Sequence, residues 1–121
     1  MNAIEKMAAQ IDALKLKSMD FAKEPPGETS GLIEVAGGEQ RPLTVVAVGD
    51  SMVLGCGCSN TKYGLVPQFL RLLAKRMNRN VEWNLVGKFG ATLTRVRYRL
   101  LPSLEGNHWD VVILCAGSND L

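Results

Sequence analysis

The sequence feature that most constrains the fold is an apolar run, LTVVAV, at residues 43–48, which ends at Gly49. A strand with one face in solvent alternates apolar and polar residues, and this run does not alternate. We therefore expect a strand that is covered on both faces, as in the parallel sheets of α/β proteins. The chain has enough apolar material for such a core, because 46% of its 121 residues are hydrophobic.

Two more strands and two helices are predicted further along the chain. Residues 65–77 and 92–104 carry apolar residues at helical spacing, and residues 81–86 and 109–115 form short apolar runs. The resulting order of strand, helix, strand, helix, strand favours right-handed crossovers and an α/β fold with a parallel sheet. The last of these strands is expected to be buried on its faces, with one edge unpaired.

Two segments precede this pattern. Residues 1–24 predict an amphipathic helix, and residues 25–42, which are rich in glycine and proline, predict a linker or loop. The apolar stripe of the predicted helix consists of Ile4, Met7, Ile11, Leu14 and Phe21. Such a helix packs on its own domain or serves as a docking element, and the helix and the unpaired strand edge are both candidate contacts for a homodimer. Residues 43–121 then form the α/β domain.

The turns that follow the three predicted strands carry the candidate functional residues. In an open α/β sheet, ligands bind beyond the carboxyl ends of the strands, so these turns should meet at one edge. They contain Ser51 after the first strand, Gly90 after the second and Asn119 after the third. A serine hydroxyl and hydrogen-bond donors for an oxyanion are parts that nucleophilic acyl transfer needs. Each residue alone fits an ordinary cap or turn, but their succession at three strand ends favours a catalytic site.

The three turns resemble the sequence blocks of the SGNH hydrolases, also called GDSL esterases and lipases. The resemblance covers residues 43–121, and Met52 stands where many members have leucine. The blocks are Gly49-Asp50-Ser51-Met52, Gly90, and Gly117-Ser118-Asn119-Asp120. The resemblance implies a flavodoxin-like, three-layer parallel sheet and an esterase or lipase that acts on a small-molecule ester.

The same resemblance implies a role for each block. Ser51 would be the nucleophile, and the oxyanion hole would consist of the backbone N–H groups of Ser51 and Gly90 and the side-chain amide of Asn119. The residues expected to support the turns are Gly49, Asp50 and Gly117. Asp50 is expected to structure its turn rather than to act as an acid. No metal or cofactor is expected, because the chain has a single histidine and no set of ligands at metal-binding spacing.

The general base is missing from these blocks. In the resembled family an Asp-x-x-His block supplies it, and this sequence contains no such block. His108 precedes the third strand, whereas Asn119 follows it, so about 20 Å should separate the two ends and His108 should lie on a surface loop at the wrong edge. We expect that residues 1–121 are the front portion of a larger domain, with the base encoded beyond Leu121. A second chain that completes the sheet and an inactive remnant that binds or docks are the alternatives.

The remaining sequence properties exclude or weaken other functions. A net charge of +2 does not indicate nucleic acid, and neither a membrane span nor a secretory signal is present, which predicts a cytoplasmic chain. Cys56, Cys58 and Cys115 are expected to be free thiols. The excess of basic residues between Lys62 and Arg99 is expected to be solvated rather than to bind an acidic partner. No phosphate-binding glycine pattern follows a strand, which weakens the nucleotide-binding interpretation.

Overall fold

The computed structural model describes residues 2–8, 10, 23–38 and 40–121. Residues 3–8 and 10 are helical, and Ile4 and Met7 of the predicted N-terminal stripe are exposed there. Ile11, Leu14 and Phe21 of that stripe lie outside the described residues. The strands and α-helices that follow are β1 (Ser30–Ile33), β2 (Leu43–Gly49), α2 (Leu65–Met77), β3 (Val81–Gly87), α3 (Leu93–Arg95) and β4 (Val111–Cys115). The described residues also form the short helical turns η2 (Thr61–Tyr63), η3 (Val96–Leu100), η4 (Leu101–Leu104) and η5 (Ser118–Asp120).

The described strands form one mixed sheet in the order β1-β3-β2-β4. Strand β2 pairs in parallel with β3 and with β4, so that Val45 lies between Trp83 and Val111. The three predicted strands and the parallel pairing among them are observed, but the sheet as a whole is mixed rather than parallel as predicted, because β1 pairs antiparallel with β3. Their carboxyl ends lie at the same edge of the sheet, where the register pairs Gly49 with Gly87 and with Cys115.

The prediction of a linker or loop over residues 25–42 is wrong for residues 30–33, which form β1. This strand pairs antiparallel with β3, and Gly31 lies opposite Trp83. A Cβ atom on Gly31 would lie 2.8 Å from the Trp83 ring, so the glycine allows β1 to approach the indole closely. The glycine that indicated a loop in the sequence is therefore a packing position in an edge strand.

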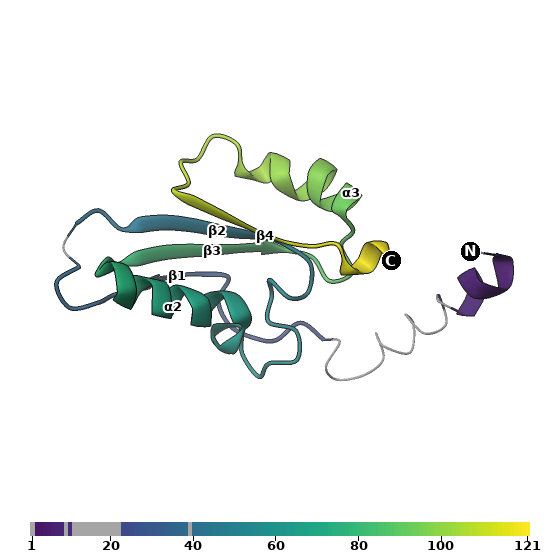
Figure 1. Ribbon diagram of the computed structural model, residues 1–121, viewed down its shortest axis with the longest axis horizontal. Coiled ribbons are helices and arrows are strands. Elements are labelled where there is room, and N and C mark those ends of the chain that lie inside the picture. Colours follow the sequence, from purple (N-terminus) through teal and green to yellow (C-terminus); the bar gives the residue numbers. More distant parts are fainter. Residues whose placement is uncertain (1, 9, 11–22, 39) are drawn as a thin grey trace.

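Helices cover both faces of β2 and divide the core into two clusters. On one face, Val45 and Ala47 pack with Leu70 and Ala74 of α2. On the other face, Val48 packs with a cluster from the segment that runs from α3 to η4. Figure 1 shows these two helical layers on opposite sides of the sheet. The expected covering of β2 on both faces is confirmed, since its residues 45–48 are 0% exposed.

Strand β4 departs from the expectation of a fully buried strand. Its Val111 and Ile113 pack against the core on the α2 side, but Val112 and Leu114 are 51% and 59% exposed. The segment from α3 to η4 contacts β2 on that side of the sheet and leaves β4 uncovered. In the described part of the chain, β4 is also an edge strand, as the sequence predicted.

The second predicted helix, residues 92–104, is helical but not a regular α-helix. It begins as α3, continues through a π-helical turn in which Leu101 donates its backbone N–H to Val96 O, and ends in a 3-10 turn that contains Pro102. Proline lacks a backbone donor and crowds the preceding turn, which breaks α-helical bonding. By contrast, α2 has the predicted bounds, and its C-cap Asn78 adopts a left-handed conformation with φ 51°.

Candidate active site

The three turns that follow β2, β3 and β4 meet at one edge of the sheet, as predicted. The Asp50 N–H donates to Cys115 O at 3.1 Å, and the Lys88 N–H donates to Gly49 O at 3.1 Å. A Cβ atom at Gly49 would lie 1.9 Å from Cys115 O. Glycine at this position therefore lets the first and third turns bond directly through their backbones.

Asp50 organises the turn that carries Ser51. Its carboxylate is almost completely buried and accepts a hydrogen bond from Met52 N at 3.0 Å. Its second oxygen accepts from the Ser118 hydroxyl at 3.3 Å. The Asp50 carboxylate thus holds its own turn and joins it to the turn after β4, which fits a structural role.

Ser51 itself is half-buried at the start of this turn. Its carbonyl oxygen accepts from Cys56 N at 3.0 Å, which closes the turn behind it. Within the part of the chain that the structure describes, no hydrogen bond involves the Ser51 hydroxyl. The hydroxyl is therefore available to a ligand, but no described side chain acts on it as a base.

Gly90 lies in the exposed turn between β3 and α3 and has a φ of +77°. A Cβ atom there would have no neighbour within 4 Å. In the structure, the requirement for glycine comes from the left-handed backbone, which a larger residue adopts only with strain.

Two side chains of the third turn hold the Gly90 turn. The Asn119 amide donates through Nδ2 to Ala91 O at 3.0 Å. An amide NH₂ group has two hydrogens, so this bond orients the side chain and leaves one donor for a ligand. Both oxygens of Asp120 accept from Leu93 N, at 3.0 and 3.3 Å. Sequence reasoning did not assign a role to Asp120, because its partner Leu93 lies 27 residues away and no local pattern indicates such a bond.

His108 lies at the opposite edge of the sheet, as predicted, and its side chain is 74% exposed. Its Nε2 atom is 2.9 Å from Asp110 Oδ1, and Asp110 also accepts from both terminal nitrogens of Arg41 at 3.0 Å. The hydroxyl and N–H of Thr44 complete the set at 3.0 and 2.8 Å. The Arg41 guanidinium, the Thr44 N–H and the His108 ring hold the pKa of the Asp110 carboxyl far below its usual range. This cluster joins the starts of β2 and β4, and sequence reasoning did not find it.

Cys56, Cys58 and Cys115 form no disulfide with one another. Cys115 ends β4 beside the Ser51 turn. Burial, and secondarily the negative charge of Asp50, raise the pKa of the Cys115 thiol. Among the described residues, no cluster of three or more histidine, cysteine or acidic side chains has the arrangement of a metal site.

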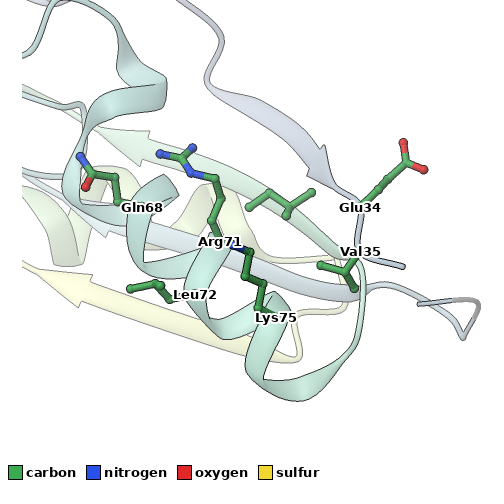
Figure 2. Close-up of a pocket in the computed structure, with 7 residues that line it drawn as sticks. Glu34, Val35, Gln68, Arg71, Leu72 and Lys75 are labelled. Carbon is green, nitrogen blue, oxygen red and sulfur yellow. The ribbon is translucent and has the colours of Figure 1, made fainter. Parts of the chain in front are cut away.

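One hollow of the described residues lies elsewhere on the molecule. It has a volume of about 380 Å³ and lies between α2 and the segment that follows β1. Figure 2 shows Arg71 and Lys75 of α2 on one side and Glu34 and Val35 on the other. None of its lining residues belongs to the three turns. The candidate active site is therefore an open edge of the sheet rather than this hollow.

Comparison with known proteins gives the family. The model of the GDSL-like lipase/acylhydrolase family matches residues 47–121. The chain belongs to this family. No curated protein matches the chain, and no solved structure matches it.

The family match covers the whole candidate site of this GDSL-like chain. It begins within β2 and includes all three turns, with Ser51, Gly90 and Asn119. The GDSL-like lipase/acylhydrolase family is a hydrolase family, and the α/β architecture of the chain is compatible with it. No helix in the described residues has the length and apolar character that a membrane span requires.

Proposed function

We propose that this chain carries the nucleophile and oxyanion hole of a serine esterase that cleaves a small-molecule ester through an acyl-enzyme on Ser51. The observation that supports the proposal is the convergence of three turns at one sheet edge in a GDSL-like chain. The flavodoxin-like arrangement that the resemblance implies belongs to the same proposal. A cytoplasmic location and a reaction that needs no cofactor are also parts of this proposal.

The proposed reaction has two steps. The Ser51 oxygen attacks the ester carbonyl carbon, and the carbonyl oxygen becomes an oxyanion that accepts from the N–H groups of Ser51 and Gly90 and from Nδ2 of Asn119. Collapse of this intermediate breaks the bond to the alcohol and leaves the acyl group on Ser51. Water then attacks the acyl-enzyme and releases the acid.

The proton of the Ser51 hydroxyl needs an acceptor in the first step. No described residue forms a hydrogen bond with that hydroxyl, and His108 is bonded to Asp110 at the other edge. The proposed reaction therefore requires a general base that none of the described residues supplies. Without this base, attack by Ser51 is expected to be slow.

A second candidate function is non-catalytic. The same edge offers N–H donors to a small carbonyl compound or anion, and the free Ser51 hydroxyl fits binding as well as chemistry. In this alternative the chain is an inactive binding or interaction module.

The first prediction separates these functions by covalent labelling of Ser51. A fluorophosphonate probe is offered to the wild-type chain, to Ser51→Ala and to Ser59→Ala, which changes an exposed serine outside the three turns. We expect slow labelling of the wild type and of Ser59→Ala at Ser51, and none of Ser51→Ala, with the modified residue located by mass spectrometry.

Added imidazole tests whether the base is the missing part. It should accelerate labelling of Ser51, because a base in solution can take the proton that no described side chain accepts. A well-folded wild type that stays unlabelled with imidazole between about pH 6 and pH 9 would favour the binding module.

A further inference from the structure

The third turn, η5, contacts both other turns through three consecutive polar side chains. Ser118 donates to Asp50 in the nucleophile turn. Asn119 donates to Ala91 O, and Asp120 accepts from Leu93 N. Both bonds are to the segment that follows Gly90. The Gly90 turn is thus held on its C-terminal side at two points that lie two residues apart.

We propose that Asp120 is a positioning residue for the oxyanion hole. The inference rests on the proposed function, because it concerns the direction of the Gly90 N–H toward a reacting carbonyl oxygen. Asp120 does not touch the substrate in this proposal. Its carboxylate fixes Leu93 N, and the Asn119 amide fixes Ala91 O. One peptide unit separates this clamped segment from the peptide that carries the Gly90 N–H, and the N–H of that unit, from Ala91, donates to Lys88 O at 3.1 Å.

The hydrogen bond from Leu93 N to Asp120 is not the local N-terminal cap of α3. The Thr92 side chain already caps α3, since its hydroxyl oxygen accepts from Arg95 N at 3.3 Å. Leu93 N is a separate donor, and Asp120 reaches it from a turn that lies 27 residues further along the chain. A long-range bond added to a locally capped helix fixes where the helix begins relative to η5, which is a positioning effect.

The acceptor oxygen, rather than the charge, is the part of Asp120 that the proposal requires. A negative charge close to the oxyanion hole would repel the developing oxyanion, whereas a neutral acceptor would not. Asp120→Asn keeps an oxygen that accepts from Leu93 N and removes the charge. It should therefore preserve the function that Asp120→Ala loses.

The test measures labelling of Ser51 by the fluorophosphonate probe, with imidazole present, and separates the binding constant of the probe from the rate constant of the covalent step. We expect Asp120→Ala to lower the rate constant by about 10- to 100-fold with the binding constant nearly unchanged, because misplaced donors act mainly on the transition state. Asp120→Asn should stay within about 3-fold of the wild type. Glu105→Ala, which removes an exposed acid outside the three turns, is the control and should label like the wild type.

A second pair of variants removes the donor instead of the acceptor. Proline is well tolerated at the first position of a helix, so Leu93→Pro deletes the N–H that Asp120 accepts and keeps the helix start. Leu93→Ala controls for loss of the side chain. We expect Leu93→Pro to slow the covalent step as Asp120→Ala does, and the double variant to be no slower than either single one. If the reductions in the rate constant multiplied in the double variant, the inference would be overturned. It would also be overturned if Asp120→Ala were labelled as fast as the wild type.

A measurement on the amides separates this inference from the proposed function. The NMR shifts and hydrogen exchange of the Gly90 and Leu93 N–H groups report the turn whether or not Ser51 reacts. If the wild type is never labelled, the proposed esterase fails, and changed Gly90 and Leu93 amides in Asp120→Ala still support the positioning role. Unchanged amides in that variant would overturn the positioning role, whatever the labelling shows.

Discussion

At the scale of single residues, Gly90 and Gly106 form a natural comparison. Both are exposed, with φ values of +77° and +85°, and a Cβ at either would meet nothing within 4 Å. Only Gly90 belongs to the proposed oxyanion hole, since Gly106 lies between η4 and β4. The two positions therefore separate the cost of backbone strain from the loss of a catalytic donor.

Gly90→Ala and Gly106→Ala should each lower the free energy of unfolding by about 1 kcal/mol, because alanine is strained at positive φ. Gly90→Ala should in addition slow Ser51 labelling by about 10-fold or more, because relief of the strain turns its N–H away from the oxyanion. Chemical denaturation and the labelling assay measure the two effects. Equal labelling rates in the two variants would contradict the role of Gly90.

At the scale of elements, α2 shows how one helix divides between core and solvent. Leu70 is 0% exposed in the main core, whereas Leu72, two residues further along, is 69% exposed. Helical spacing places the two side chains on different faces, although the residue type is the same.

Leu70→Ala should lower the free energy of unfolding by about 2–5 kcal/mol, because it removes apolar contacts and leaves a cavity. Leu72→Ala should change it by less than about 0.5 kcal/mol. Urea denaturation of both variants measures the difference. Similar losses in the free energy of unfolding for Leu70→Ala and Leu72→Ala would contradict the packing of α2 described above.

The elements also show what the sequence predicts well. The bounds of α2 follow from apolar spacing and local end signals, and β2 follows from its unalternated run, so both depend on nearby residues. Strand β1 depends on the fit of Gly31 to Trp83, which is distant in sequence. The exposure of Val112 depends on where the segment from α3 to η4 lies, and no local pattern specifies that placement.

At the scale of the whole molecule, the two ends of the sheet carry different groups of polar residues. One end carries the three turns, and the other carries the Arg41, Thr44, His108 and Asp110 cluster. Parallel strands brought Ser51, Gly90 and Asn119 together and kept His108 away, and topology alone was sufficient to predict both outcomes. The bonds of Asn119, Asp120 and Asp110 depend on side-chain directions, which the sequence does not specify.

The cluster at the far end predicts a dependence of stability on pH. Its partners, Arg41 first, stabilise the ionised form of Asp110, so the pKa of that carboxyl is lower in the folded chain than in the unfolded one. The resulting stabilisation is present above the unfolded pKa of about 4 and is lost as the pH falls below it toward the folded pKa. Asp110→Asn should therefore lower the melting temperature at neutral pH and flatten its decline below about pH 5.

Thermal melts across this range measure the effect, with Glu105→Gln as a control at an exposed acid in another turn. The control should keep the wild-type slope. An equally steep acid decline in Asp110→Asn and in the wild type would show that other groups govern the stability of the chain in acid.

The glycine at position 49 affects how the candidate site is expected to move. Because no side chain separates Gly49 from Cys115, the backbones that lead to Ser51 and to Asn119 lie in direct contact. Such strands can shift only as a unit, so thermal fluctuations should displace the Ser51 and Asn119 turns in concert. The spacing between the two turns should then vary less than the position of either one.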